Sequence, residues 1–339
     1  MTNALPEALT AARDLVGPAL RRAVEQLPSP LIRQVAGYHL GWLDERGDER
    51  VSGSGKALRP ALAVLSARAV YAAPTVAVPA GIAVELVHNF SLLHDDLMDG
   101  DTERRHRPTA WTVYGNSAAI LAGDALLALA QQVLFDVEGE RALQASRRLT
   151  TATQELIRGQ VEDLSFERRG DVAVAEVLSM VAGKTAALLA CSAALGAVLA
   201  GAPPAAVTAL DAFGHEVGMA FQLVDDLLGI WGRPEVTGKP VLADLRARKK
   251  SVPVVVALNA DGASADRLRA IFAGGGPEGE EEVALAAKLI DDCGAREWTA
   301  AEARARLTAA EAELDAYDFD PLVRTELAEV ARFVAARDL

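Results

Sequence analysis

Apolar residues at helical spacing run directly into groups of aspartates at two places in this chain. The first stretch has spacings of four, four and three, at Ile82, Leu86, Phe90 and Leu93. The second has spacings of four, three and four, at Val217, Phe221, Val224 and Leu228. Each pattern predicts a helix with one buried stripe. We therefore expect two largely buried helices, both of which end in carboxylates.

The aspartates are crowded enough to need neutralising partners. The first acid group, DDLMDGD, begins at Asp95 and holds four aspartates within seven residues. On a helix, Asp95, Asp96 and Asp99 project from neighbouring positions. The second group is the pair Asp225 and Asp226. Although a lone pair is most often solvated, crowded like charges require a cation or basic groups. Mg²⁺ is usually bound through carboxylates together with substrate phosphates, so the sequence predicts Mg²⁺ with a phosphorylated ligand.

The composition favours helices throughout. Hydrophobic residues make up 51% of the chain and aromatic residues 5%, so a large core can be built mainly from Ala, Leu and Val. The best strand candidate, SVPVVVALN, fits a helix start equally well because Pro253 stands near its beginning. The breaks in the helical pattern are too short to be interdomain linkers. We predict an all-α fold and treat residues 1–339 as a single domain.

Charge and cysteine content exclude several classes of function. The net charge of −13 disfavours nucleic acid, which needs a basic surface, so metal must mediate contact with an anionic substrate. The two cysteines, Cys191 and Cys293, lack metal-ligand spacing and are expected to be core thiols. The N-terminus lacks the features of a signal peptide, and no fully apolar uncharged run reaches about 18 residues. We expect a cytoplasmic protein without a transmembrane segment.

Basic and amide side chains are grouped around the acids. GKALRP places Lys56 and Arg59 three residues apart, and RRHRP follows the first acid group closely. Further candidates lie near the second acid pair and in the segments GKT, GKP and KKSVP: Lys184, Thr185, Gln222, Lys239, Lys249 and Lys250. Each of these alone is most often a surface residue. Their grouping around two acid motifs is what indicates a site for phosphates.

In their order along the chain, these motifs resemble those of the trans-isoprenyl diphosphate synthases, also called the polyprenyl synthetase family. The matching strings are GKALRP, ELVHNFSLLHDDLMDGDTERR, GKT, FQLVDDLLG and GKPVLADLRARKKSVP. The resemblance implies a single-domain barrel of antiparallel helices around a central cavity, with both acid motifs facing each other at its mouth, and a homodimer. The implied reaction condenses isopentenyl diphosphate with dimethylallyl, geranyl or farnesyl diphosphate in the trans 1′-4 head-to-tail sense.

The resemblance also assigns roles to the site residues. The acids would hold three Mg²⁺ ions on the allylic diphosphate: Asp95, Asp96, Asp99, Asp225 and Asp226, with Asp101 in support. The allylic diphosphate would be bound by Arg104, Lys184, Thr185, Gln222 and Lys239, with Lys249 or Lys250 closing over the phosphates. The isopentenyl diphosphate would be bound by Lys56, Arg59, His88 and Arg105. The residues on which the reaction itself would depend are Asp95, Asp96, Asp99, Lys184 and Asp225.

Product length is expected to depend on residues below the first acid motif. Ser91 lies four residues before Asp95, about one helical turn below it, where a small side chain leaves room for a prenyl tail. Phe90, one residue earlier, is bulky. An aromatic residue at this position, without an insertion in DDLMD, resembles the short-chain synthases that stop at twenty carbons. We predict geranylgeranyl diphosphate, with farnesyl diphosphate second and Val87 as an alternative floor of the cavity.

Departures from the family pattern leave other functions open. Gly229 stands where a third aspartate is usual, and Leu242 where a small residue is common, although Asp244 could compensate in part. A weakened metal site would suit a non-catalytic partner subunit. A terpene cyclase shares the all-α fold and the first acid motif, but its second metal motif is absent here, since Gly229 and Arg233 occupy the required positions. The complete set of residues for isopentenyl diphosphate favours the elongating enzyme over a cyclase.

Overall fold

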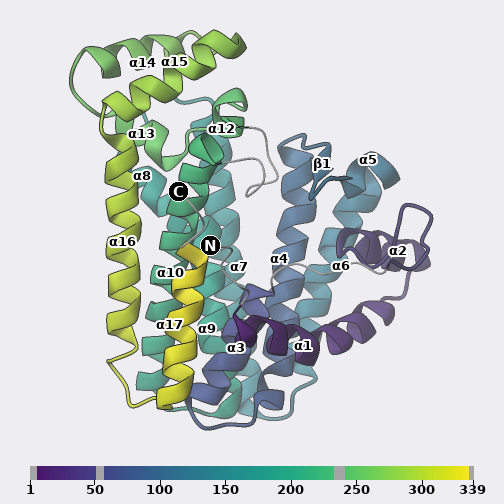
Figure 1. Cartoon of the computed structure of the whole chain (residues 1–339). Helices are drawn as coiled ribbons and strands as arrows, with labels where there is room; N and C mark the ends of the chain where they lie inside the picture. Colours follow the sequence, from purple (N-terminus) through teal and green to yellow (C-terminus); the bar gives the residue numbers. More distant parts are fainter. Residues whose placement is uncertain (1–5, 51–56, 233–240, 336–339) are drawn as a thin grey trace. The chain divides into compact units, whose positions relative to one another are not determined.

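The computed structural model describes residues 6–50, 57–232 and 241–335, and helices dominate this part of the chain, in agreement with the all-α prediction (Figure 1). The helices of the first half are α1 (Glu7–Glu25), α2 (Pro30–His39), α3 (Leu58–Ala69), the 3-10 turn η1 (Pro74–Ala77), α4 (Val78–Met98), α5 (Ala110–Tyr114), α6 (Asn116–Phe135) and α7 (Glu140–Phe166). Those of the second half are α8 (Val174–Val181), the π turn η2 (Ala182–Ala186), α9 (Ala187–Ala200), α10 (Pro204–Trp231), α12 (Ala243–Arg246), α13 (Val252–Leu258), α14 (Ala263–Ala273), α15 (Gly279–Asp292), α16 (Ala295–Glu313) and α17 (Pro321–Ala335). Strands β1 (Glu103–Arg104) and β2 (Arg107–Pro108) form a short antiparallel ribbon.

Both acid-bearing helices form, but only the first ends at its acids. α4 ends at Met98, and Asp99 is its C-terminal capping residue. α10 continues to Trp231, beyond Asp226, so the prediction that this helix ends at the acid pair was wrong. Burial explains the continuation, because an apolar stripe persists past the acids. Its interior members are Leu227, Leu228 and Ile230.

The stretch SVPVVVALN, which the sequence left between strand and helix, is the helix α13. Pro253 stands in its first turn, where a helix has no use for the missing backbone N–H and where the fixed φ of proline favours helix entry. Its valines are buried on several sides rather than alternately, which removes the reason for a strand.

The described residues form two compact units, each built from separate stretches of chain. Unit 1 comprises Met1–Thr153, Cys191–Asp211 and Ala316–Val330, and unit 2 comprises Gln154–Ala190, Ala212–Asp315 and Ala331–Leu339. The first acid group belongs to unit 1 and the second to unit 2. Four helices, α7, α9, α10 and α17, contribute residues to both units.

In unit 1, α4 packs against α3 and α6 (Figure 1). The closest approach to α6 occurs at Gly123, where a Cβ atom would overlap the ring of His94. That ring reaches the carbonyl oxygen of Ile120 at 3.0 Å. The glycine therefore lets the two helices approach closely just before the first acid group.

In unit 2, the second acid pair sits on α10 above a core that α8, α10, α13 and α16 share. Its central side chains are Val177, Met180, Leu223, Val224 and Val255. The π turn η2 interrupts the helical run between α8 and α9, and such turns often re-aim side chains at functional sites. Here the turn carries Lys184 and Thr185, two of the predicted phosphate-binding residues.

Three helical stretches are long and apolar enough to cross a membrane by length and composition alone: Pro74–Met98, Asn116–Phe135 and Val174–Ala200. The buried shares of their most apolar windows are 67%, 44% and 83%. Burial within the protein gives the first and third an ordinary reason to be apolar. The middle stretch, α6, leaves more of its apolar surface uncovered.

Candidate active site

The carboxylates of the first acid group differ strongly in burial. Asp96 is 1% exposed, whereas Asp99 and Asp101 are exposed. Oδ1 of Asp96 accepts a hydrogen bond of 2.6 Å from Nε of Arg104, and Oδ2 has no partner among the residues that the structure describes. Burial raises the pKa of Asp96 to about 6, Arg104 opposes this shift, and the charges of Asp101 and Asp99 add to it. A buried carboxylate oxygen in this state is suited to a cation.

The ribbon of β1 and β2 carries Arg104 back to this carboxylate. Arg104 pairs with Arg107 across a turn of Arg105 and His106, whose φ angles are 53° and 59°. Two positive φ angles suit the twist of a tight antiparallel turn but are uncommon outside glycine, asparagine and aspartate. Thr109 anchors the ribbon, because its hydroxyl donates to a carbonyl of the acid group at 2.8 Å. The backbone of the ribbon thus fixes the two paired arginines, Arg104 and Arg107, beside the first acid motif.

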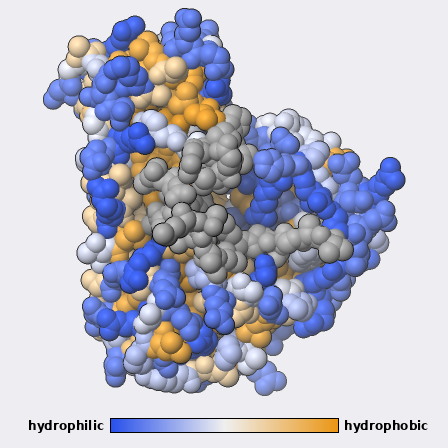
Figure 2. All heavy atoms as spheres, viewed as in Figure 1, coloured by the Kyte–Doolittle hydropathy of each residue, from blue (hydrophilic) through white to orange (hydrophobic). Residues whose placement is uncertain are grey.

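A cavity of about 250 Å³ next to the ribbon is lined by Asp96, by uncharged residues and by five basic side chains. These are His39, Arg50, Arg104, Arg105 and Arg107. Arg107 serves the protein itself, since its guanidinium donates to the carbonyls of Tyr38 and Leu43 at 3.1 and 2.9 Å. The other three arginines of this cavity, Arg50, Arg104 and Arg105, provide positive charge that suits phosphate groups. On the face drawn in Figure 2, mostly polar side chains gather over α2, β1 and α5, the elements around this cavity.

His39 and Arg50 were missed by the sequence analysis, because neither belongs to a motif. Burial lowers the pKa of His39 to about 3, and the charges of Arg104, Arg105 and Arg107 add to this shift. His39 is therefore neutral, and its Nε2 has no hydrogen-bond partner within the described part of the chain. Only the fold brings the end of α2 to the basic cavity.

The residues assigned to isopentenyl diphosphate come together around the middle of α4. Burial lowers the pKa of His88 well below its ordinary value, and so do Arg59, Arg105 and Arg104. His88 therefore offers hydrogen bonds rather than charge. Burial also lowers the pKa of Arg59, to about 10, so this guanidinium stays charged at neutral pH. The fourth predicted member, Lys56, lies outside the described residues.

The two residues predicted to limit product length are both buried on α4. The ring of Phe90 packs edge to face on His94, with centroids 5.0 Å apart. The hydroxyl of Ser91 donates to the carbonyl of His88 at 2.9 Å. Phe90 is thus held by a neighbour that itself reaches α6, which makes it a fixed rather than a mobile obstacle.

The second acid group joins three predicted residues in one hydrogen-bonded chain. Thr185 donates through its hydroxyl to Oε1 of Gln222 at 2.7 Å, and Nε2 of Gln222 donates to Oδ1 of Asp226 at 2.8 Å. The other oxygen of Asp226 accepts from the backbone N–H of Val252 at 2.8 Å. Burial raises the pKa of Asp226 to about 7, and the charge of Asp244 adds to this shift. Asp226 is anchored on both oxygens, while its neighbour Asp225 is only partly buried.

Gly229 leaves space for the side chain of Asp244. A Cβ atom at Gly229 would overlap the Asp244 carboxylate, so no larger residue fits there without movement. The charge of Asp244 in turn raises the pKa of Asp226, which places the two acids in one neighbourhood. The missing third aspartate of the motif is thus matched by a carboxylate that arrives from α12.

Lys184 is held by a residue that the sequence analysis did not single out. Its Nζ lies 2.5 Å from Oδ2 of Asp163 on α7. α7 and the π turn approach so closely that a Cβ atom on Gly159 would overlap the backbone of Lys184. The sequence GQVEDL, which contains Asp163, carries no signal for this pairing. Only the packing of two distant segments reveals it.

Lys250 is bound to the protein rather than presented to solvent. Its ammonium donates to the backbone carbonyls of Phe166 and Arg169 at the end of α7. Burial lowers its pKa. The predicted movement over phosphates would have to break both bonds, whereas Lys249 is exposed. The other predicted lysine of this region, Lys239, lies outside the described residues.

Within the described residues, no three His, Cys, Asp or Glu side chains converge to form a complete metal site. The donors that are present are nevertheless hard carboxylate oxygens, including the unpartnered Oδ2 of Asp96. Such a set fits Mg²⁺, which commonly takes one or two carboxylates and completes its shell with water and substrate phosphates.

The comparison with protein families identifies the family of this chain. Residues 41–290, well over half of the chain, match the model of the Polyprenyl synthetase family. The chain belongs to the polyprenyl synthetase family. It is therefore a transferase that joins isoprenyl units, with the all-α isoprenoid synthase fold that the sequence predicted. Its relatives are named as prenyl diphosphate synthases, which removes the terpene cyclase alternative.

Two curated relatives of this prenyltransferase come from Mycobacterium tuberculosis. A (2E,6E)-farnesyl diphosphate synthase is 51% identical over 311 residues, which are 91% of this chain and 86% of the relative. A geranylgeranyl diphosphate synthase is 50% identical over 265 residues, 78% of this chain and 75% of the relative. The two identities are nearly equal although the farnesyl synthase match covers more of the chain, so identity alone does not choose a product length.

Solved structures agree with the family assignment of this polyprenyl synthetase. A polyprenyl synthetase from Streptomyces coelicolor A3(2) has a TM-score of 0.92 and 51% identity, covering 97% of this chain and 99% of that one. A geranylgeranyl pyrophosphate synthase from Corynebacterium glutamicum, complexed with isoprenyl diphosphate and magnesium, has a TM-score of 0.83 and 27% identity, covering 99% and 100%.

Proposed function

We propose that the chain condenses isopentenyl diphosphate with allylic diphosphates to geranylgeranyl diphosphate, with Mg²⁺ as its metal. The observation that carries the proposal is the assembly of cations and acids at two places. Arg104 donates a hydrogen bond to Asp96 beside the basic cavity. Thr185 and Gln222 form a hydrogen-bonded chain to Asp226, and Lys184, next to Thr185 on the π turn, pairs with Asp163. Metal and ligand in the Corynebacterium glutamicum structure support the same chemistry for this chain.

Each group of residues has a part in the proposed reaction. Arg104 and Lys184 bind the allylic diphosphate and stabilise the charge that grows on it as it leaves the allylic carbon. Mg²⁺, when bound by the acid groups, would supply further positive charge at the same oxygens, and we infer three ions from the family resemblance. Arg59, Arg105 and neutral His88 hold the isopentenyl diphosphate so that its double bond faces the allylic cation. Buried apolar side chains around α4 exclude water that would quench this cation.

The twenty-carbon product rests on Phe90 and Ser91. Phe90 is buried and braced by His94, so it can act as a fixed floor below the acids. Farnesyl diphosphate remains the second candidate because the farnesyl and geranylgeranyl synthases of Mycobacterium tuberculosis are almost equally similar to this chain.

Replacing Phe90 by alanine tests the floor. Opening this position should lengthen the main product by at least one five-carbon unit, because removal of the ring leaves space for the growing tail. Chain-length analysis of the dephosphorylated products would show the change. Leu327→Ala, on a buried position of α17 that does not line the basic cavity, is the matched control. If Phe90→Ala leaves the product distribution unchanged, Phe90 is not the residue that limits product length, and Val87 is the next candidate.

The reaction itself is tested by incubating the purified chain with Mg²⁺, isopentenyl diphosphate and each allylic starter in turn. A twenty-carbon diphosphate whose formation stops when Mg²⁺ is chelated would support the whole proposal. A fifteen-carbon product would favour the farnesyl alternative. If no product forms with any starter, the result would instead favour a non-catalytic partner subunit, the alternative that the altered second acid motif left open.

We also infer a homodimer, supported by an apolar face on α6 and the start of α7. Its exposed large side chains are Ile120, Leu121, Phe135 and Leu143, whose exposures are 41%, 57%, 61% and 45%. Exposed apolar side chains in such numbers commonly mark an interface. A cytoplasmic location without a membrane span belongs to the same proposal, since α6 would then be covered by a second copy rather than by lipid.

A further inference from the structure

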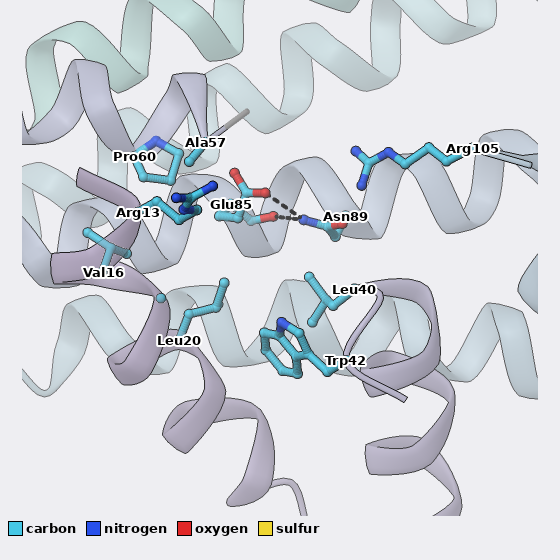
Figure 3. A pocket seen from close by; sticks show the side chains of 11 residues that line it. Arg13, Val16, Leu20, Leu40, Trp42, Ala57, Pro60, Glu85, Asn89 and Arg105 are labelled. Carbon is cyan, nitrogen blue, oxygen red and sulfur yellow. Dashed lines mark hydrogen bonds between the residues drawn. The ribbon is translucent and has the colours of Figure 1, made fainter. Parts of the chain in front are cut away.

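A small cavity of about 60 Å³ is lined by one of the residues assigned to isopentenyl diphosphate, Arg105, and also by an acid (Figure 3). Glu85 of α4 lines it, together with Arg13 of α1, Arg105 of the ribbon, and Ala57 and Pro60, which flank Arg59 in sequence. Figure 3 shows Arg13 and Arg105 on either side of the pair formed by Glu85 and Asn89. A carboxylate next to a site for an anion requires an explanation, because it would repel the ligand.

The carboxylate of Glu85 is held in one position. Nδ2 of Asn89, one turn later on α4, donates to Oε1 of Glu85 at 3.2 Å and to the backbone carbonyl of the same residue at 2.8 Å. Asn89 is 3% exposed, so this amide has little freedom to turn away. Residues four apart on a helix are neighbours, which makes such a pair a rigid unit.

Two guanidinium groups, the partly buried one of Arg59 and the exposed one of Arg105, lie in the neighbourhood of this acid. Arg105 lines the same cavity as Glu85, and so does Pro60, which directly follows Arg59. Burial raises the pKa of Glu85, and the charges of both arginines lower it. Nε of Arg59 is buried and has no hydrogen-bond partner among the described residues. Without an acid nearby, the like charges of Arg59 and Arg105 would repel each other before a ligand arrives.

We propose that Glu85, anchored by Asn89, is a positioning residue that holds Arg59 and Arg105 ready for the diphosphate of the isopentenyl substrate. This inference rests on the proposed function, because it takes these arginines as the isopentenyl diphosphate site. Glu85 does not touch the substrate. It supplies one negative charge from behind, so that two cations can stay close together and face the ligand.

Replacing Glu85 by glutamine tests this role, because the shape is kept and the charge is lost. The KM for isopentenyl diphosphate should rise about tenfold, the effect of losing one charge-assisted interaction, while the KM for the allylic diphosphate should stay within about twofold. Calorimetric titration with isopentenyl diphosphate alone should show the same loss of affinity. Glu85→Asp, which restores the charge on a shorter side chain, should recover part of it.

The matched control is Glu326→Gln, which removes a partly buried carboxylate that also pairs with an arginine in unit 1, Arg68, at 2.5 Å. Its KM for isopentenyl diphosphate should equal that of the unaltered chain. If Glu85→Gln does not fold, Asn89→Ala decides, because it releases the carboxylate without removing its charge. A higher KM for isopentenyl diphosphate in Asn89→Ala would support the role.

Different failures point to different errors. If the unaltered chain neither binds nor consumes isopentenyl diphosphate, the proposed function fails and this inference falls with it. If the unaltered chain is active and Glu85→Gln, or in its place Asn89→Ala, keeps the KM of the control, only the positioning role is overturned. A rise in the KM values of both substrates by the same factor would also overturn it, because it would indicate a general structural effect.

Discussion

At the residue scale, the second acid pair makes stability depend on pH when no metal is bound. Burial raises the pKa of Asp226 from its ordinary value of about 4 to about 7. The folded state therefore holds this proton more tightly than the unfolded state, so the contribution of Asp226 to stability falls as pH rises from about 4 to about 7. The loss is of the order of 4 kcal/mol at most, since each pKa unit corresponds to about 1.4 kcal/mol and Asp244 shares the effect.

We predict that the free energy of unfolding of the chain, with metal removed by a chelator, is lower at pH 7.5 than at pH 5. This decrease should be larger in the unaltered chain than in Asp226→Asn. Urea unfolding at both pH values measures the difference. Added Mg²⁺ with diphosphate should reduce it, because a bound cation favours the ionised carboxylate. Equal pH dependence in the two chains would show that Asp226 is ionised at lower pH than its burial indicates.

Also at the residue scale, only one carboxylate fits in the space that Gly229 leaves, and Asp244 supplies it. Gly229→Asp, which restores the family's third aspartate, should destabilise the chain and lower its activity, since the new side chain overlaps the Asp244 carboxylate and adds a like charge. The double change Gly229→Asp with Asp244→Ala should recover much of both losses. Thermal unfolding and turnover of the three variants test this coupling. A fully active single variant would remove the compensating role of Asp244.

At the scale of elements, the position of Lys184 depends on how closely α7 approaches the π turn. Gly159→Ala should cost about 1–3 kcal/mol of stability, because its methyl group overlaps the Lys184 backbone and must displace the turn. It should also lower turnover, since the pairing of Lys184 with Asp163 moves with the turn.

The matched control for this prediction is Gly17→Ala in α1, where no atom lies within 4 Å of the added carbon. There the exchange should leave stability unchanged or raise it by about 0.5–1 kcal/mol, because alanine favours helix. Denaturant unfolding and steady-state kinetics compare the two variants. Similar effects at both glycines would mean that the close approach is not what fixes Lys184.

At the scale of the whole molecule, the exposed face of α6 should hold two copies together. Leu121→Glu and Phe135→Glu each place a charge on this face and should convert the dimer to a monomer with a lower melting temperature. Light scattering after size exclusion measures the mass. Leu322→Glu on α17, a position that is 65% exposed, is the control and should stay dimeric. A mass independent of all three changes would place the interface on another face.

Much of this protein follows from local patterns in its sequence. Apolar residues at helical spacing dictate helices wherever they recur, and α4 formed with its acids at the C-terminal end as expected. The acid motifs and basic strings likewise predicted Arg59, His88, Arg104, Thr185, Gln222 and Asp226 as site residues. In the structure Arg104 bonds to Asp96, Thr185 and Gln222 form a chain to Asp226, and the charge of Arg59 acts on His88. The end of α10 was misplaced, because a charged pair does not stop a helix whose buried stripe continues.

What the sequence could not supply are the contacts between segments far apart in the chain. Asp163 pairs with Lys184, Asp244 occupies the space beside Gly229, and His39 lines the basic cavity. Local spacing fixes which side chains share one helix face, since the backbone repeats regularly. Which face meets which neighbour depends on packing over the whole core, and there the sequence leaves no short-range signal.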